Sequence, residues 1–522
     1  MAFKYTEEQL NKLDKELLIQ LFLGLQEQLE ALTAQTEALN TKMQQMMEQL
    51  ILSNKSRFGR SSEKLEDTSQ IRFMEVDGTI VFFNEAEADI SGLPRQRIDH
   101  YLSEEELTAE FGEKGWKQLP DVISNCYRFV PAKVEIEEHH IGVYSSKTDE
   151  HMVKAPHPKK LLRGSLVSES LAAAIMNGKY VNAVPLYRLE KEFERYGLAI
   201  TRQNMANWMI RLSEEYLAVM YDYLHELLYN YHVIQADETP VLVNKDGRPA
   251  GSKSWMWVYR SGFMYPERQI ILYEYQKTRN ASHPREFLKN YTGICVTDGY
   301  QVYHTLEKER EDLKIAGCWV HCRRKFDEAL TVIPKELRKQ SVLYLIMKQI
   351  QAIYREEGKL TALSSEERLK QRQLVVQPLV DAFFSYLKQN RDKAGKSSKA
   401  KEAFTYALNQ EPYLRVFLED GDVPMDNNAS ERAIRGFCGF CGFCIGKKNW
   451  EMIDTIHGAN SSAIIYSIAE TAKANNLKPY EYFEYLLTEI PKHMEDTNRD
   501  FLTELLPWAK TLPEYIRKPE EK

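Results

Sequence analysis

Four β-type segments between residues 232 and 300 place the strongest constraint on the fold, because helical patterns precede and follow them. Three are rich in β-branched and aromatic residues: HVIQADETPVLV, KSWMWVYRSG and RQIILYEYQKT. A short helical segment, HPREFLKNY, then precedes a fourth strand-like run, GICVTDGY. Three strands, a helix and a further strand predict a mixed α/β sheet. The chain has 522 residues, so three or four folding units are expected around it.

Acidic residues stand at three places where such a sheet could use them. Asp237 lies inside the first apolar run, Asp298 ends the fourth, and Glu431 lies in the first turns of a later helix, NNASERAIRGF. We expect Asn427 or Asn428 to cap that helix. A carboxylate inside an apolar strand is costly unless it is paired or bound to a metal. Three converging carboxylates would bind two divalent cations, Mg²⁺ or Mn²⁺, because these ions prefer oxygen ligands. The alternative is that the aspartates form strand-end turns and that the glutamate is a solvated helix residue.

The first fifty residues carry a heptad pattern. Apolar residues from Leu18 to Leu50 alternate at spacings of four and three over more than four heptads. Because only a narrow stripe is apolar, residues 1–52 are predicted to form a coiled coil through which the protein self-associates. The alternative is a helix that packs on a domain. Residues 53–100 are predicted to be a linker and an irregular segment, whose basic residues either contact phosphates or are merely solvated. The candidates for phosphate contact are Lys55, Arg57 and Arg60.

Residues 165–230 show three helical patterns, LVSESLAAAIMNG, VPLYRLEKEFERYG and TRQNMANWMIRLSEEYLAVM. The turn between the second and third has Gly197 at a helix end and Thr201 as the expected N-cap. This arrangement could be a helix-turn-helix that binds DNA. Packing of three helices without a DNA role is at least as common. The side chains expected to face DNA are Arg202, Gln203 and Asn207.

Cysteine content and charge bound the location and the partners. Seven cysteines behind a charged, amphipathic N-terminus indicate reduced thiols and a cytoplasmic location, and no apolar run is long enough for a membrane span. A net charge of −7 argues against a uniformly basic DNA-coating protein but leaves room for local basic patches. Cys438, Cys441 and Cys444 form CxxCxxC within a Gly-Phe-Cys repeat. CxxCxxC could ligate an iron–sulfur cluster, but such a cluster usually needs a fourth cysteine, so none is expected.

Longer motifs carry a resemblance to a known family. KSRFGRSSEKL, VPLYRLEKEF, VIQADETPVLV, VTDGY, CWVHCRRKF, DNNASERAIR, IGKKNW, AIIYSIAETAKANNLKPYEY and LLPW occur in this order. With them the chain resembles the insertion-sequence-66 transposases of the transposase C type, from the N-terminal heptads to about Trp508. The resemblance implies a DDE enzyme with a ribonuclease H-like domain, whose triad falls on Asp237, Asp298 and Glu431.

The resemblance also implies an activity and partners. A bacterial, nucleoid-associated DNA transposase would bind the terminal inverted repeats of its element, hydrolyse a phosphodiester and transfer the strand to target DNA. Its cofactors would be two Mg²⁺ or Mn²⁺ ions, and its partners double-stranded DNA, further copies of itself and small accessory proteins. The segment CWVHCRRKF places Cys318 and His321 after the second aspartate. These two residues are half a zinc site, so we favour a structural or DNA-strand-handling role and expect no zinc. Further candidate phosphate contacts are Arg323, Arg324, Arg432, Arg435, Lys447 and Lys448.

The expected fold class is multidomain α+β. Its parts are a coiled coil (1–52), a linker and irregular segment (53–100), a degenerate zinc-ribbon-like module (101–164), a helical DNA-binding module (165–230), a ribonuclease H-like catalytic domain (231–325 and 422–490) interrupted by an all-helical insertion (326–421), and a C-terminal tail (491–522).

Two departures from the family pattern leave other functions open. The paired cysteines of the zinc-binding region are absent and only Cys126 remains there, so no zinc ribbon is expected. The triplet repeat begins five residues after Glu431 and could shift its helix. One alternative is therefore a catalytically impaired copy that still binds DNA. The other is a nuclease of the same fold that cuts without strand transfer.

Overall fold

A computed structural model describes the backbone of residues 72–76 and 79–83, and then residues 102–103, 105–106, 109, 133–145, 152–156, 159–249, 251–262, 264–394, 398–434 and 452–519. The predicted coiled coil lies outside these residues, as does the Gly-Phe-Cys repeat. In the described part of the chain, none of the helices combines the length and apolar character needed to cross a membrane.

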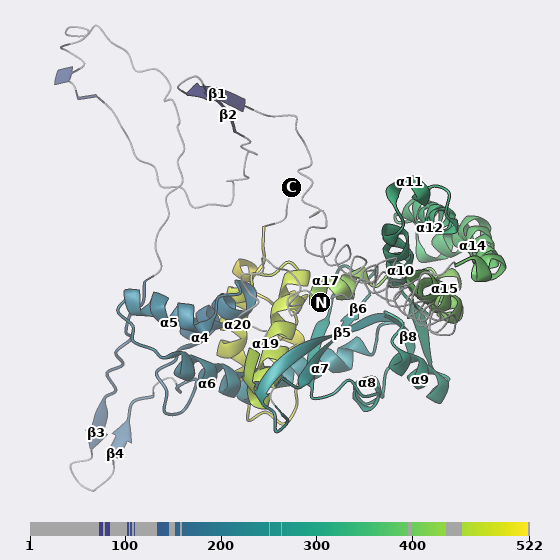
Figure 1. Cartoon of the computed structure of the whole chain (residues 1–522). Helices are drawn as coiled ribbons and strands as arrows, with labels where there is room; N and C mark the ends of the chain where they lie inside the picture. Colours follow the sequence, from purple (N-terminus) through teal and green to yellow (C-terminus); the bar gives the residue numbers. More distant parts are fainter. Residues whose placement is uncertain are drawn as a thin grey trace, which may run out of the picture.

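A mixed sheet forms the centre of the molecule, as the sequence predicts (Figure 1). Its strand order is β7-β6-β5-β8-β9; β6 is antiparallel to β5 and β7, whereas β8 and β9 run parallel to β5. The long strand β5 pairs with β8 through its first residues and with β10, also in parallel, through its last residues. The strands are β5 (Val233–Lys245), β6 (Lys253–Ser261), β7 (Ile271–Gln276), β8 (Gly293–Thr297), β9 (Leu313–Gly317) and β10 (Met452–Thr455).

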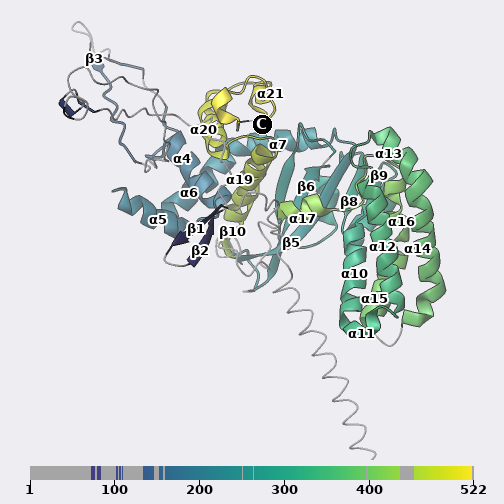
Figure 2. The ribbon, with the colours of Figure 1, turned by 90° about the horizontal axis from the view of Figure 1, so that it is seen from above.

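Two hydrophobic cores lie on opposite faces of the sheet at the start of β5 and at β8, whereas the buried apolar residues of β6 and β7 belong to one of them. Alternate residues of a strand point to opposite faces, so Val233 and Val296 face one core while Ile234 and Cys295 face the other. The first core is built with helices that lie between β9 and α17 in the sequence, and Figure 2 shows them as a bundle beside the sheet. These helices are α10 (Trp319–Val332), α11 (Lys335–Arg338), α12 (Val342–Gly358), α13 (Ser365–Gln371), α14 (Gln377–Asn390), α15 (Ser398–Asn409) and α16 (Glu411–Leu414).

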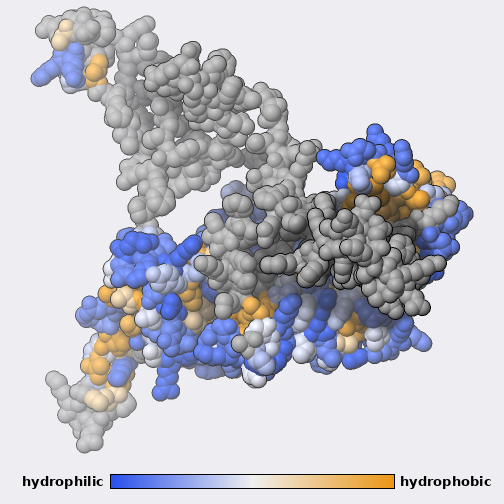
Figure 3. Space-filling view, in the orientation of Figure 1, coloured by the Kyte–Doolittle hydropathy of each residue, from blue (hydrophilic) through white to orange (hydrophobic). Residues whose placement is uncertain are grey.

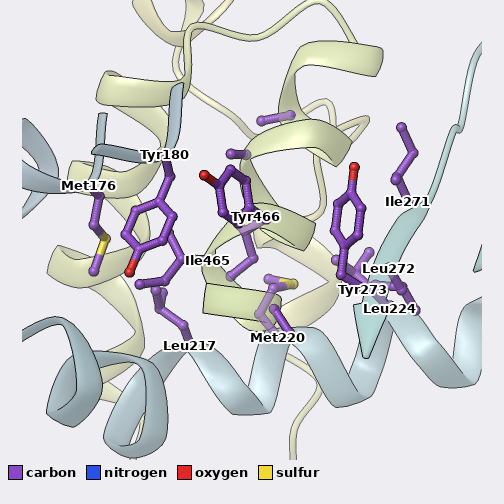
Figure 4. Close-up of a cluster of buried hydrophobic side chains, with 14 of the residues drawn as sticks. Met176, Tyr180, Leu217, Met220, Leu224, Ile271, Leu272, Tyr273, Ile465 and Tyr466 are labelled. Carbon is purple, nitrogen blue, oxygen red and sulfur yellow. The ribbon is translucent and has the colours of Figure 1, made fainter. Parts of the chain in front are cut away.

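The second core joins the sheet to helices from both ends of the chain. Figure 4 shows Tyr180, Met220, Tyr273 and Tyr466 side by side, and the rings of Tyr180 and Tyr466 meet edge to face at 4.9 Å. The helical segment that precedes the sheet therefore shares a continuous core with it. The helices outside the bundle are α4 (Glu169–Met176), α5 (Leu186–Arg195), α6 (Arg202–Leu212), α7 (Ala218–Leu228), α8 (Ser282–Phe287), α9 (Gln301–Glu309), α17 (Asn428–Ile434), α19 (Ile456–Ala474), α20 (Pro479–Glu489) and α21 (Leu502–Leu505).

The outer edge of β7 is closed by α19. The Thr471 hydroxyl accepts from the backbone N–H of Ile271 and donates to its carbonyl oxygen, both at 3.0 Å. One turn earlier on the helix, the Ser467 hydroxyl accepts from the N–H of Tyr273 at 2.8 Å. An exposed strand edge invites pairing with another chain, so these side chains protect the sheet as well as stabilise it.

Local signals in the sequence place the first helices correctly. Gly197 has a φ of +83°, a left-handed conformation that suits glycine at the end of α5. The Thr201 hydroxyl accepts from the N–H of Asn204 at 3.2 Å and caps α6.

Two small hairpins lie nearer the N-terminus, β1 (Arg72–Val76) with β2 (Thr79–Phe83) and β3 (Val143–Ser145) with β4 (Met152–Lys154). The strand-like pattern of residues 125–155 yields only β3 and β4 in the described part of that range. Its apolar side chains Val143 and Val153 remain about half exposed, at 56% and 51%, so little burial supports longer strands there.

The visible surface is mostly hydrophilic, with small apolar patches (Figure 3). One such patch lies over α11 and α12, where Leu337 and Leu345 are exposed. Scattered apolar side chains of this kind are normal on a soluble protein.

Candidate active site

Strand register brings the two aspartates together. Gln235 of β5 pairs with Val296 of β8 in parallel. Extending this register by two residues brings Asp298 level with Asp237, and both side chains then point to the same face because the strand repeat is two. Thr297 of β8 pairs with Gly317 of β9, so extending that register by one residue places Cys318 beside Asp298.

Asp237 is a carboxylate in an unfavourable setting for its own charge. Burial is the main cause that raises its pKa well above the ordinary value, and the charges of Asp298, Glu238 and Glu431 raise it further. The N–H of Glu238 donates to Asp237 Oδ1 at 2.8 Å and partly offsets this effect. A group of like charges that destabilise one another is a place where a bound cation would be favourable.

Asp298 is held by the turn that follows β8 and by the helical bundle. The N–H of Tyr300 donates to its Oδ1 at 2.9 Å, and the Tyr406 hydroxyl of α15 donates to its backbone oxygen at 2.8 Å. Gly299 has a φ of +93°, and a Cβ there would lie 2.9 Å from the Tyr406 hydroxyl. Glycine is therefore needed for both the backbone conformation and the close approach of α15.

Glu431 is carried by α17, whose start is bonded to the sheet. The side-chain amide of the fully buried Asn427 donates to the backbone oxygen of Ala236 at 2.7 Å and its Oδ1 accepts from Gln235 Nε2 at 3.1 Å. The expectation that the side chain of Asn427 caps the helix needs correction, because these bonds direct it to β5 instead. Its backbone oxygen accepts the N–H of Glu431 at 3.1 Å.

Carbonyl groups of α17 are fixed to neighbouring strands. Arg260 of β6 donates to the oxygen of Ala429 at 3.2 Å, and the Tyr273 hydroxyl of β7 donates to the oxygen of Ala433 at 2.7 Å. Figure 2 shows α17 lying against the sheet near β6 and β8. The helix is thus held against β5, which carries Asp237, and against β6 and β7.

The chain leading into α17 is held by a buried arginine of the bundle. Arg372 donates to the backbone oxygens of Phe417 at 2.8 Å and Asp420 at 2.7 Å, and its Nε bonds Glu357 at 3.1 Å. With this salt bridge and two carbonyl bonds, the bundle fixes the segment that delivers Glu431 to the sheet.

The first turn of α10 contacts Glu431 directly. His321 Nδ1 lies 3.6 Å from Glu431 Oε1, and Arg324 Nη2 lies 3.3 Å from Oε2. Burial lowers the pKa of His321, while Asp298 and Glu431 raise it, so the imidazole lies near both carboxylates. Burial raises the pKa of the Cys318 thiol to about 12.

Glu238 belongs to the opposite face of the sheet, as its position next to Asp237 requires. Arg279 Nε donates to its Oε1 at 2.8 Å, and the Tyr303 hydroxyl donates to its Oε2 at 3.1 Å. Burial raises the pKa of Glu238 to about 7, with Asp298 adding to the shift and Arg279 opposing it. Glu238 is thus paired with the guanidinium of Arg279 on the face of the sheet opposite to Asp237.

The remaining predicted DNA-contacting residues are spread over several elements. Arg202 and Gln203 are exposed at the start of α6, Arg323 lies over the Tyr354 ring at 5.7 Å, and Arg432 is exposed on α17. They thus come from three different elements, α6, α10 and α17. The residues outside the described part of the chain are Lys55, Arg57, Arg60, Arg435, Lys447 and Lys448.

Sequence reasoning missed two residues that position the carboxylates. Asn427 was expected only as a cap, because a doubled asparagine before a helix is the usual sign of capping. Tyr406 gave no sign at all, since it lies 108 residues from Asp298 and resembles any aromatic residue of an amphipathic helix.

Comparison with known proteins places the chain in a family. Residues 164–461 match the family described as "Transposase IS66 family", and residues 467–508 match the "IS66 C-terminal element". Uncharacterized protein y4qI of Sinorhizobium fredii is 28% identical over 73% of this chain and 69% of its own length. Uncharacterized protein y4jD of the same organism is 26% identical over 81% of this chain and 82% of its own. The chain belongs to the IS66 family, the transposases of insertion sequences that act on DNA.

Proposed function

We propose that this protein is a DDE transposase that cuts a phosphodiester at the ends of its element and joins the freed 3′-hydroxyl to target DNA. Asp237, Asp298 and Glu431 are its metal-binding carboxylates. The observation that carries the proposal is the register of β5 and β8, which brings the two aspartates level on the face that α17 covers.

The charges of the site fit divalent cations. The pKa of Asp237 is raised by burial and by two other carboxylates of the proposed triad, so the ionised site is unstable without added positive charge. Oxygen ligands of this kind suit Mg²⁺ or Mn²⁺. When bound as a pair, such ions supply activation of a water or a 3′-hydroxyl and stabilisation of the leaving oxygen.

The protein's own groups hold the carboxylates and the DNA in place. Asn427 fixes the helix of Glu431, and Tyr406 fixes the backbone of Asp298. Arg324, whose side chain is half exposed, bonds Glu431 at 3.3 Å. We propose that the guanidinium turns to a DNA phosphate once Glu431 serves as a ligand, because a bidentate donor suits both partners.

Other parts of the chain would bring DNA and further copies to this site. The exposed start of α6, with Arg202 and Gln203, is proposed to contact the element ends as the second helix of a helix-turn-helix. The heptads of residues 1–52 would pair two or more copies, so that two ends are held together. The first role rests on the helix pattern, the second on the heptads, and the help of small accessory proteins on the family resemblance.

The test uses purified protein and a supercoiled plasmid that carries the DNA flanking its own gene. With Mg²⁺ or Mn²⁺ the wild-type protein should give nicked product with a 3′-hydroxyl, and then joined product. Asp237→Asn, Asp298→Asn and Glu431→Gln should each reduce cutting to background while they retain DNA binding. Glu238→Gln is the matched control, because this carboxyl neighbours Asp237 but faces the other side of the sheet.

Each outcome separates the proposal from its alternatives. Cut product without joined product would favour a nuclease of the same fold. Specific binding without cutting by the wild-type protein would indicate an impaired copy. Cutting that survives the loss of any of the three carboxylates, in variants whose circular dichroism matches the wild type, would overturn the assignment of the triad.

A further inference from the structure

Three different metal-binding side chains meet beside the proposed catalytic carboxylates. One ligand atom each of Cys318, His321 and Glu431 lies within 4.8 Å of the other two. The sequence showed only the first two, three residues apart at the start of α10, and for that reason zinc was not expected. The third comes from α17, 110 residues further along the chain from His321.

Two atoms of this group lack the partners that buried polar atoms normally have. Among the described residues, neither His321 Nδ1 nor Glu431 Oε1 has a hydrogen-bond partner, although both atoms are buried. They lie 3.6 Å apart, which is too long for a hydrogen bond between nitrogen and oxygen. Buried polar atoms without a partner require an explanation. A metal ion bound by His321 Nδ1, Glu431 Oε1 and the Cys318 thiol would give both atoms a partner.

The positions of the ligands are set by rigid elements. The N–H of Asn427 donates to Cys318 Sγ at 3.2 Å, and the N–H of Trp319 donates to the oxygen of Met425 at 3.1 Å. These bonds tie the start of α10 to the segment that enters α17. The group is therefore assembled by the fold itself.

We propose that Cys318, His321 and Glu431 form a second metal site that binds Zn²⁺. Sulfur, nitrogen and oxygen ligands together suit zinc, which takes three protein ligands and one water in open sites, whereas Mg²⁺ and Mn²⁺ disfavour thiolate. Bonds from zinc to its ligands are about 2.0–2.3 Å long. The three ligand atoms would therefore have to move toward one another by roughly 1 Å to bind one ion. On binding, the thiol proton passes to solvent and the sulfur binds as thiolate.

Glu431 belongs both to the proposed zinc site and to the carboxylate triad. Zinc bound with Cys318 and His321 would compete with the carboxylate triad for Glu431. Zinc would therefore suppress DNA cutting that depends on Mg²⁺. This consequence rests on the proposed function, whereas the existence of the site does not.

Binding is tested with Co²⁺, which accepts zinc ligands and shows a thiolate charge-transfer absorption. The full chain carries Cys438→Ser, Cys441→Ser and Cys444→Ser, so that the triplet repeat cannot supply the thiolate. We expect one Co²⁺ per chain with this absorption, displaced by Zn²⁺. Cys318→Ser should abolish the absorption, and His321→Ala should weaken binding at least about tenfold, the scale on which even supporting residues of a metal site act. Cys322→Ser, the neighbouring buried cysteine of α10, is the matched control and should keep it.

No absorption in the repeat-free protein, or absorption that survives Cys318→Ser, would overturn the site. Should Cys318→Ser fail to fold, the loss of Co²⁺ binding in Glu431→Gln tests the site in its place. In the cutting assay, zinc should inhibit the wild-type protein and leave Cys318→Ser less sensitive. If no metal supports cutting, the proposed function fails while the cobalt result still decides the site. If cutting occurs and zinc does not inhibit it, the antagonism is wrong.

Discussion

The side-chain amide of Asn427 donates to the backbone oxygen of Ala236 at 2.7 Å, so the residue before α17 is bonded to the residue before Asp237. Asn427→Ala should destabilise the protein by about 2–3 kcal/mol, because it leaves buried polar groups of β5 without partners. It should also reduce cutting more than the folded fraction falls, since Glu431 loses its anchor. Urea unfolding and the plasmid assay measure the two effects, and Asn409→Ala, at an exposed position, is the control. Cutting that falls only in step with the folded fraction would contradict an anchoring role.

Removal of the Asp237 charge should stabilise the protein when metal is absent. Burial and neighbouring carboxylates disfavour its ionised form, so Asp237→Asn should raise the free energy of unfolding at neutral pH in EDTA. Added Mg²⁺ should stabilise the wild type but not the variant. The exposed Asp392→Asn should change neither value by more than about 0.5 kcal/mol. An equal response of both proteins to Mg²⁺ would argue against a metal at Asp237.

Loss of one hydroxyl from the helical bundle should impair catalysis. Tyr406→Phe removes the bond to the backbone oxygen of Asp298, which should cost about 0.5–1.5 kcal/mol of stability and loosen the aspartate. We expect the Mg²⁺ concentration needed for half-maximal cutting to rise. Tyr344→Phe, on α12 of the same bundle, controls for the loss of a hydroxyl and should leave that concentration unchanged. An unaltered metal requirement in Tyr406→Phe would show that Asp298 is held by its own turn.

Glu274 should make stability depend on pH. Burial raises its pKa to about 7 in the folded chain, against about 4.3 in an unfolded chain. The folded state thus keeps a proton that the unfolded state releases, so stability is lost as pH rises from about 4.3 through about 7. Glu274→Gln should remove this loss and exceed the wild type by on the order of 2–3 kcal/mol at pH 8. The free energy of unfolding is measured between about pH 5 and pH 8, with the exposed Glu311→Gln as the control. Parallel pH curves for the wild type and Glu274→Gln would refute the prediction.

The closed edge of β7 should depend on a hydroxyl of α19. Thr471→Val leaves the N–H and the oxygen of Ile271 unpaired and should cost about 1–3 kcal/mol. Aggregation on partial unfolding should increase, because the strand edge is freed. Thr488→Val is the matched control, since its hydroxyl bonds the Glu484 oxygen of its own helix and not a strand. Denaturant unfolding and light scattering measure both effects, and equal results for the two variants would contradict the role of Thr471.

Local patterns predicted some of this structure and long-range pairing decided the rest. Thr201 and Gly197 gave the ends of α6 and α5 because capping and left-handed turns are written in a few adjacent residues. The strands β5, β6, β7 and β8 followed from their β-branched and aromatic residues, whereas β9 and β10 of the same sheet were not predicted. The approach of Asp298 to Asp237 depends on how β5 and β8 align. That register cannot be read from the sequence of either strand alone. The group of Cys318, His321 and Glu431 was likewise hidden, because it forms only when α17 docks.

The attachment of α17 has a consequence for how this gene can vary. The hydrogen bonds that fix the helix to the sheet, from Asn427 at its start to Ala433 near its end, involve residues that precede the Gly-Phe-Cys repeat. Replication slippage that adds or deletes triplets therefore alters a stretch of chain without editing any of these anchors. The repeat lies after the last anchor of α17 and before β10, so sister copies of the element with different triplet numbers would keep the same Glu431 and the same bonds that hold its helix.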